Sequence, residues 1–217
     1  MKNKRMIALM WAFALLPAVM LALCWGALPA RVPTNWGFDG RVTYSAKSTL
    51  WIIAALGPAV AALIQFMPRI DPRKENYRRF QGAYDGVGVG IVLFFVLIMA
   101  VVLLESLRPG TVAVSRVVTA LVCVLFVGLG CIMGKVKTNW FMGIRTPWAL
   151  SDPDVWNRTQ RAGGWVFFLA GLVNLPLALL APEKVFFVTL LVPTVLGLAA
   201  VCALSWKWYQ DKEEEQE

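Results

Sequence analysis

Most of the side chains that could recognise a ligand lie in two polar loops, and these loops share a motif. Arg31–Trp36 reads RVPTNW and Lys135–Trp140 reads KVKTNW. Each copy follows an apolar segment and leads into a Gly, an Arg and a Thr, as GRVT in the first loop and GIRT in the second. In the first loop, Asn35 and Asp39 are candidates for ligand contact because an aromatic belt at a membrane surface needs no carboxylate, although Asp39 is equally suited to a turn.

The second loop places Arg145 in the sequence GIRTPW, between a glycine turn and a proline-stiffened segment. A guanidinium in such a turn can make a forked contact to a carboxylate, to a phosphate or to carbonyl groups. The same geometry also allows Arg145 to tie its own loop together. We give these two interpretations equal weight.

The sequence argues against catalysis and against a resident metal or cofactor. It contains no His, which removes the commonest general base and zinc ligand, and no nucleophile with a partner base is visible. The cysteines Cys24, Cys123, Cys131 and Cys202 all fall in apolar segments, where a free thiol behaves as a small hydrophobe. We therefore predict a protein that is not an enzyme, with no cofactor and no metal.

The elements that must position the two loops are membrane spans. Hydrophobic residues make up 59% of the 217 positions and charged residues only 16%, which is too apolar for an ordinary soluble domain. Stretches near the ~20 apolar residues that cross a bilayer recur about six times. We expect spans at 6–28, 50–67, 86–104, 117–133, 165–180 and 185–206, the first of them uncleaved, and hence an all-α polytopic fold.

The Lys and Arg residues predict the orientation of these spans. With the N-terminus in the cytoplasm, the inner segments hold fifteen of the 21 Lys and Arg residues, as the positive-inside rule requires. Both ends of the chain are then cytoplasmic, loop 29–49 lies outside and loop 134–164 lies inside. The net charge of +8 is mostly a signal of topology, and no basic module remains that could bind nucleic acid.

Within the inner loop, the sequence SDPD predicts the start of a helix. Ser151 suits the N-cap, Pro153 the first turn and Asp154 the capping-box position. We expect a short helix over 152–162 that lies at the membrane surface before the fifth span.

The repeated TNW motif suggests that the chain consists of two related halves. One copy follows the first span and the other follows the fourth, so 1–104 and 105–217 would each hold three spans. An odd number of spans turns the second half upside down relative to the first, as in inverted-repeat transporters. We treat this 3+3 inverted repeat as a hypothesis.

The same loops resemble a known family. LPARVPTNWGFDGRVTYSAKS resembles the domain of unassigned function that often begins SdpI immunity proteins, and GKVKTNWFMGIRTPWALSDPDVWNRTQRAGG resembles the SdpI signature itself. The chain departs from the family at Asn35, where His is usual, and at Thr159 and Gln160, where Thr-His is frequent. Any role of those imidazoles therefore does not transfer. The positions that carry over are Pro33, Trp36, Asp39, Gly40, Lys137, Asn139, Gly143, Arg145, Thr146, Pro147, Trp148 and Trp156.

The resemblance implies a bacterial cytoplasmic (inner) membrane protein that protects its producer from a secreted peptide toxin. It also implies signal transduction, in which a transcriptional repressor is held at the cytoplasmic face. The expected partners are thus the lipid bilayer, a peptide toxin outside and a repressor inside. The alternative is a small inverted-repeat transporter or exporter, but ionisable groups at bilayer depth, which mark transport pathways, are nearly absent from the predicted spans.

Overall fold

The computed structural model describes residues 4–37, 41–180 and 183–215. The long helices are α1 (Lys4–Cys24), α2 (Leu50–Ile70), α3 (Gln81–Leu107), α4 (Val114–Met133), α6 (Pro153–Leu180) and α7 (Glu183–Glu214). The shorter elements are β1 (Arg31–Trp36), β2 (Val42–Ala46), α5 (Pro147–Ser151) and the 3₁₀ turns η1 (Lys47–Thr49) and η2 (Lys74–Arg79).

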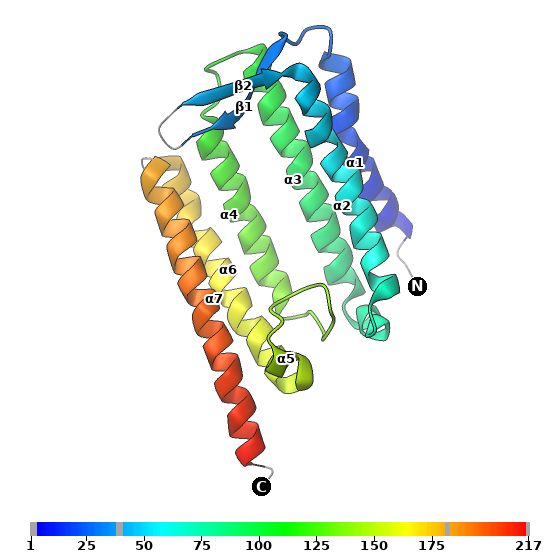
Figure 1. The fold of residues 1–217 in the computed structure, drawn as a ribbon, viewed down its shortest axis with the longest axis vertical. Helices are drawn as coiled ribbons and strands as arrows, with labels where there is room; N and C mark the ends of the chain where they lie inside the picture. The colour runs from blue at the N-terminus through cyan, green and yellow to red at the C-terminus, as the bar shows by residue number, and fades with distance from the viewer. Residues whose placement is uncertain (1–3, 38–40, 181–182, 216–217) are drawn as a thin grey trace.

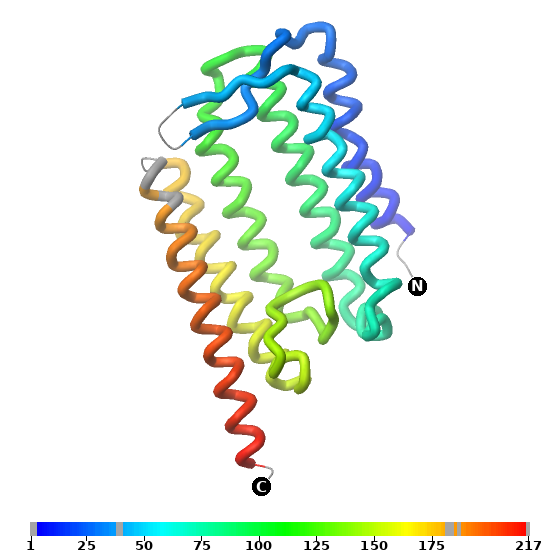
Figure 2. The backbone as a smooth tube through the Cα atoms, in the orientation of Figure 1, coloured from blue at the N-terminus to red at the C-terminus, as the bar shows by residue number. Residues whose placement is uncertain are grey.

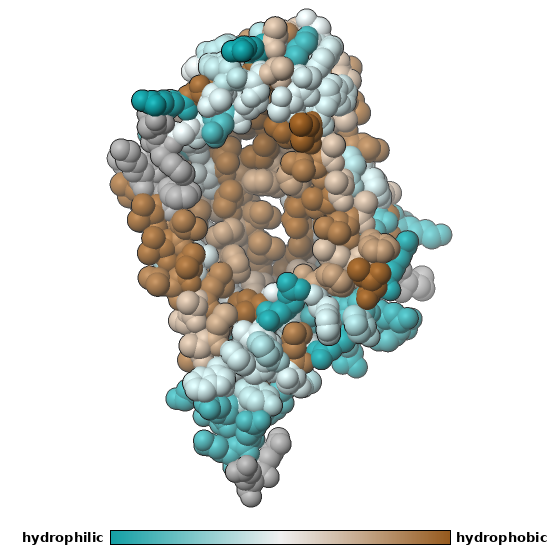
Figure 3. Space-filling model, in the orientation of Figure 1, coloured by the Kyte–Doolittle hydropathy of each residue, from teal (hydrophilic) through white to brown (hydrophobic). Residues whose placement is uncertain are grey.

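Among the described residues, six helices are long and apolar enough to cross a membrane, which confirms the predicted number and order of spans. Apolar side chains surround most of each helix, because the outer face meets lipid and the inner face meets other helices. Figure 3 shows a broad hydrophobic belt over the helices and hydrophilic residues at both ends. Prolines such as Pro17, Pro176 and Pro193 lie inside the helices, where packed neighbours tolerate the lost hydrogen bond.

The helices form two groups of three, which Figures 1 and 2 show side by side. Helices α1, α2 and α3 pack on one another in the first group, and α6 packs between α4 and α7 in the second. Helices α3 and α4 connect the groups, and an apolar crevice of about 240 Å³ lies between them. The hollow in the middle of Figure 3 lies at this junction.

A two-stranded antiparallel hairpin covers one end of the first group, as a small addition to the helical membrane fold that the sequence predicts. The strands pair Arg31 with Ala46 and Trp36 with Val42, with an irregularity between Pro33 and Asn35. Hydropathy locates spans but says nothing of strands in a polar loop, whose pairing here joins residues six to fifteen positions apart. The turn expected at 38–40 lies outside the described residues.

The arrangement of the chain ends agrees with the predicted topology. Helix α1 begins and helix α7 ends at the same end of the bundle, and the hairpin lies at the opposite end (Figure 2). The loop that follows α4 lies at the same end as the termini (Figure 1). We call these two ends the inner and outer ends according to the distribution of Lys and Arg, and the orientation itself stays a prediction.

The prediction of a short, separate surface helix over 152–162 is wrong. Residues 147–151 form α5, and α6 then runs without interruption from Pro153 to Leu180. The N-cap of α6 is Asp152 rather than Ser151, because Asp152 Oδ1 accepts hydrogen bonds from the backbone N–H groups of Asp154 (2.7 Å) and Val155 (2.9 Å). Gly163 and Gly164 do not end the helix, since both are buried against neighbouring elements.

The two TNW copies have different backbone conformations. Thr34–Trp36 belongs to strand β1, whereas Thr138–Trp140 lies in a loop without regular structure. The packing of the halves also differs, since α1 and α3 pack extensively while α4 and α7 barely touch. A shared sequence therefore does not give a shared local structure, and the division at 104/105 stays a proposal.

Candidate functional site

The inner loop folds into a compact structure that we call the inner cap, which consists of η2, residues 134–146, α5 and the first turns of α6. Its hydrophobic centre comes from both halves of the chain: Tyr77, Phe80, Tyr84, Val136, Ala149, Val155 and Trp156. Trp156 is fully buried, and its indole Nε1 donates a hydrogen bond to the carbonyl of Val136 at 2.8 Å. This predicted site residue therefore anchors the loop to α6.

Asp71, at the end of α2, is the main polar anchor of the inner cap, and the sequence analysis missed it. Only 2% of its surface is exposed. One carboxylate oxygen accepts from the backbone N–H of Arg73 at 2.7 Å, and the other accepts from the Tyr77 hydroxyl and from the N–H of Trp140, both at 2.8 Å. Three donors thus compensate the cost of burying this charge.

Tyr77 is held in its neutral form by this environment. Burial raises the pKa of its hydroxyl far above the usual value, and the hydrogen bond to the Asp71 carboxylate raises the pKa further. A phenolate beside a buried carboxylate would be destabilised by both effects. Tyr77 therefore acts as a hydrogen-bond donor in the inner cap over the physiological pH range.

Asn139 shapes the loop around its own side chain. Its Oδ1 accepts from the backbone N–H groups of Phe141 (2.9 Å) and Met142 (2.6 Å), and its Nδ2 donates to the carbonyls of Lys137 (2.9 Å) and Met142 (3.0 Å). Asn139 is fully buried, and Lys137 is half-buried. This pattern satisfies the backbone of a loop that has no regular structure. Asn139 is therefore a structural residue.

Gly143 and Gln160 form a second structural contact in the same loop. Gly143 has φ of 103°, and a Cβ atom at this position would lie 2.4 Å from the Gln160 Oε1 atom. The amide of Gln160 accepts from the Ile144 N–H at 2.9 Å and donates to the Ile144 carbonyl at 2.8 Å. Gln160, noted from sequence only as a departure from the family, thus fixes the position of the loop on α6.

The segment from Arg145 to Trp148 connects the loop to α5 and α7. The Arg145 guanidinium donates to the Trp140 carbonyl, which agrees with the interpretation that it ties its own loop together. The Thr146 hydroxyl caps α5, where Pro147 is the first residue, and also lies 2.8 Å from the Ser205 hydroxyl of α7. The Trp148 indole donates to the same hydroxyl, so Ser205 is a further residue that sequence reasoning missed.

Two more hydrogen bonds connect residues 138 and 150 of the inner cap to the first half of the chain. Asn76 Nδ2 donates to the Thr138 carbonyl at 2.7 Å, and Arg73 Nη2 donates to the Leu150 carbonyl at 2.8 Å. The donors lie in the segment between α2 and α3, more than 60 residues away from their acceptors. Spacing in the sequence therefore gives no signal for these contacts.

The end of α7 is held to the inner cap by an ionic contact. Lys212 Nζ lies 2.8 Å from Asp152 Oδ2 and 2.6 Å from Asp154 Oδ2. Burial alone raises the pKa of Asp152, but the hydrogen bonds from Lys212, Val155 and Asp154 together lower it below its usual value. Asp152 therefore caps α6 and binds α7 as a carboxylate.

The outer hairpin is the second candidate site. Pro33 is buried, Asn35 is exposed, and half-buried Trp36 packs against the core of the first helix group. The hydroxyls of Thr34 and Ser45 lie 2.8 Å apart across the strands. Asp39 and Gly40, the other predicted site residues of this loop, lie outside the described residues. Of the predicted outer residues with a described position, only Asn35 is open to contact from outside.

The hairpin is attached to the helices by Lys47. Its ammonium donates to the Trp25 carbonyl at 3.1 Å and lies 4.6 Å from the centroid of the Trp25 ring. The indole faces of Trp25 and Trp51 lie close together, with centroids 5.9 Å apart. The outer end therefore combines a polar hairpin with interfacial aromatic residues.

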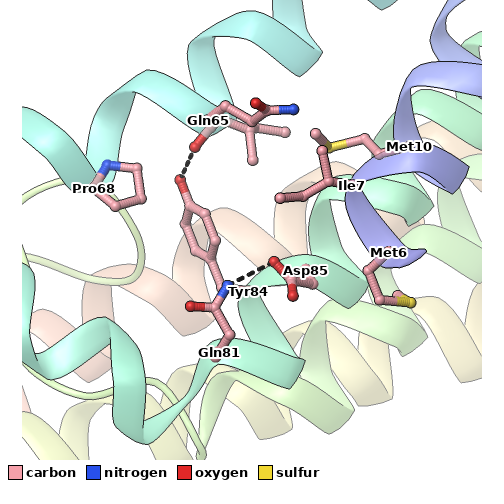
Figure 4. A pocket seen from close by; sticks show the side chains of 9 residues that line it. Met6, Ile7, Met10, Gln65, Pro68, Gln81, Tyr84 and Asp85 are labelled. Carbon is pink, nitrogen blue, oxygen red and sulfur yellow. Dashed lines mark hydrogen bonds between the residues drawn. The ribbon is translucent and has the colours of Figure 1, made fainter. Parts of the chain in front are cut away.

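A small, mostly apolar pocket with a few polar side chains lies between the inner ends of α1, α2 and α3 (Figure 4). Its volume is about 50 Å³, which has room for little more than water. The Asp85 carboxylate accepts from Gln81 Nε2 at 2.8 Å, and the Tyr84 hydroxyl donates to the Ile64 carbonyl at 2.6 Å. The buried Nε2 atom of Gln65 has no hydrogen-bond partner among the described residues. The pocket is too small for a peptide.

These observations define a multi-pass helical membrane protein with a polar structure at each end of its bundle. Residues 135–205 match the SdpI/YfhL protein family, and residues 12–57 match a domain of unknown function, DUF1648. The chain is 23% identical over 191 residues to the immunity protein SdpI of Bacillus subtilis (strain 168), with 84% of this chain and 86% of that protein covered. No solved structure matches the chain. The predicted resemblance to the SdpI family is thereby confirmed, through the same two loops.

Proposed function

We propose that this protein is a non-enzymatic immunity protein of the bacterial cytoplasmic membrane that protects against a secreted peptide toxin. The observation that carries the proposal is the similarity to immunity protein SdpI, which extends over 84% of the chain and includes the segments of both polar ends. Similarity confined to the membrane spans would not support inferring the same function.

The geometry is compatible with recognition on the outer face. The hairpin presents Asn35, Tyr44 and Arg41 on its exposed surface, and half-buried Trp36 connects it to the helix core. A peptide that approaches from outside would therefore meet the hairpin first, and helices α1 and α2 connect the hairpin to the inner end.

We further propose that the inner cap docks a transcriptional repressor. Exposed basic side chains surround the cap, and a partner with an acidic surface would fit them: Lys74, Arg78, Arg79, Lys135 and Arg158. Because the cap is held by buried hydrogen bonds rather than by flexible side chains, it offers a rigid surface for a protein partner.

Transport is less well supported. Among the described residues, Asp71 is the buried side chain that carries a charge, and it lies at the inner end, where it serves the fold of the cap. A proton-coupled or ion-coupled pathway needs ionisable groups within the bilayer.

The test is survival of a toxin-sensitive bacterium that expresses this protein and is challenged with the secreted peptide toxin of the SdpI system. Wild type should protect, and Asn35→Ala and Asp39→Ala should each lower the tolerated toxin concentration severalfold. Asn157→Ala is the matched control, because it makes the same truncation on the inner side of the bundle.

The outcomes separate the parts of the proposal, provided that the membrane levels of the variants are equal. Lost protection in the outer variants alone supports recognition by the hairpin. Protection by wild type and by both outer variants places recognition elsewhere, and absence of protection by wild type refutes immunity to this toxin. The docking proposal is tested with the repressor of the toxin system fused to a fluorescent protein. If the fusion stays in the cytoplasm during toxin challenge, the docking proposal is refuted.

A further inference from the structure

A crevice between the inner ends of α4 and α6 has the features of a lipid site. Its volume is about 270 Å³, and the lining comes from Gly130 and Cys131 on α4, from Gly134 directly after α4, and from Arg161, Trp165 and Phe168 on α6. The three α6 residues follow one another at i, i+4 and i+7, so they lie on one face of the helix. None of these residues belongs to the contacts that hold the inner cap.

The floor of the crevice exists because α4 and α6 approach very closely. A Cβ atom on Gly130 would lie 2.6 Å from the backbone nitrogen of Phe168, and one on Gly164 would lie 2.9 Å from the carbonyl oxygen of Gly130. Gly134 is different, since its nearest neighbour would be the Arg161 Cγ atom at 3.4 Å. Gly130 and Gly164 therefore allow the close packing of the two helices, whereas Gly134 leaves space beside the Arg161 side chain.

Arg161 has no counter-ion among the described residues. Its side chain is exposed, and it takes part in no hydrogen bond or ion pair within the described part of the chain. Arg73, Arg145 and Lys212, also at the inner end, all bind carbonyl or carboxylate groups. The guanidinium of Arg161 is therefore available for an anion.

The depth of these residues fits the profile of a phospholipid. Helix α6 has 28 residues and is thus roughly 42 Å long, about 12 Å longer than the hydrocarbon core. The excess lies at the inner end, because α4 ends at Met133 and its next residue, Gly134, faces Arg161. Arg161 is then at the headgroup level, and Trp165 and Phe168 lie one and two turns deeper.

Trp165 and Phe168 continue this polarity gradient. Trp165 is 63% exposed and packs edge-to-face on Phe168, with ring centroids 5.7 Å apart. An exposed indole is favoured at the ester region of a bilayer, whereas a phenyl ring is favoured beside acyl chains. Along one face of α6, the side chains therefore change from cationic to amphipathic to apolar over two turns.

We infer that this crevice binds an anionic phospholipid of the inner leaflet, with the phosphate at Arg161 and one acyl chain along Trp165 and Phe168. No carboxylate lines the crevice, so the ammonium of a zwitterionic headgroup would find no partner there. Lys135, which directly follows Gly134, is an exposed cation that also favours a net negative headgroup.

The test compares lipid retention by the intact protein in native mass spectrometry, after reconstitution with equal amounts of phosphatidylglycerol and phosphatidylcholine. Wild type should retain phosphatidylglycerol in preference to phosphatidylcholine. Arg161→Gln should weaken phosphatidylglycerol retention about tenfold, since it removes a charge-assisted contact to phosphate. Arg158→Gln, an equally exposed cation one turn earlier on α6, should change retention by less than about twofold.

A second variant separates shape from charge. Cys131→Trp keeps Arg161 but fills the crevice from an exposed position on α4, so it should also abolish the preferential retention. Equal losses in Arg161→Gln and Arg158→Gln would show a diffuse electrostatic effect and overturn the site. Retention that is unchanged in Cys131→Trp, or equal retention of the two lipids by wild type, would overturn it as well.

Discussion

At the scale of single residues, the inner cap depends on whether buried polar atoms find partners. Asp71→Asn replaces one carboxylate oxygen by an NH2 group. Either the Arg73 N–H or the pair formed by the Tyr77 hydroxyl and the Trp140 N–H then loses its acceptor. We expect a loss of about 2 kcal/mol in the free energy of unfolding, because a buried donor is left without an acceptor. Thermal unfolding in mild detergent measures the effect.

Asp211→Asn is the control for this prediction, since Asp211 is exposed near the end of α7. It should leave the melting temperature within about 1 °C of wild type, as expected for a surface substitution. Equal melting temperatures of Asp71→Asn and Asp211→Asn would mean that Asp71 does not stabilise the cap.

Gly143 is constrained by backbone conformation and by space together. Gly143→Ala should cost more than about 2 kcal/mol, because the left-handed conformation strains any Cβ atom and the Gln160 amide, held by two hydrogen bonds to Ile144, cannot easily move away. Gly110→Ala is the matched control, with φ of 79° in open space, and should cost only about 1 kcal/mol. Chemical or thermal denaturation of both variants in detergent tests the difference. Equal losses of stability in the two variants would mean that the contact with Gln160 adds nothing to the backbone strain.

At the scale of elements, the end of α7 is predicted to respond to pH. The lowered pKa of Asp152 means that its ionic contact stabilises the docked helix above the unfolded pKa of about 3.9, and that this stabilisation is lost as the pH falls through the folded pKa. A spin label on Asp211→Cys, in a background without other cysteines, should become mobile at acidic pH. In Lys212→Ala the label should already be mobile at pH 7.

Lys207→Ala provides the comparison for the α7 prediction, because Lys207 is exposed on the same helix and forms no ion pair among the described residues. The spectrum of the label at position 211 should be the same in Lys207→Ala as in the protein with Lys207, at every pH. A label that stays immobile at pH 7 in Lys212→Ala would show that packing of Trp208 and Tyr209 against the cap holds the helix without the ionic contact.

Sequence reasoning succeeded for elements defined by local composition and failed where distant residues decide. The six spans followed from apolar runs, each of which is visible within a short window. The hairpin was missed because strand pairing joins residues across a turn. Helix α6 was predicted too short, although Gly163 and Gly164 continue it because both pack against neighbouring elements. Asp71 and Ser205 were missed, and the role of Gln160 was not foreseen, since each contacts a partner 16 to 69 residues away.

At the scale of the whole molecule, the described residues join the two three-helix groups mainly at two places. Helices α3 and α4 contact each other, and residues 138–150 of the inner cap bind Asp71, Arg73 and Asn76 of the first half. The proposed division near 104/105 falls close to the exposed turn between α3 and α4, where Pro109 and Gly110 have few contacts. The buried hydrogen bonds of the cap should therefore matter more for association of the halves than the continuity of this turn.

This argument predicts the behaviour of a split protein. When residues 1–109 and 110–217 are expressed together as separate chains, the second should co-purify with a tagged first chain from the membrane. Arg73→Ala combined with Asn76→Ala should lower the recovery severalfold, because the Leu150 and Thr138 carbonyls lose their donors. Lys74→Ala with Glu75→Ala, two exposed neighbours in the same segment, should not change it. Recovery that is equal in both double variants would assign association to α3 and α4 alone, and the inner cap would then be a structure of the second half rather than the joint between the two.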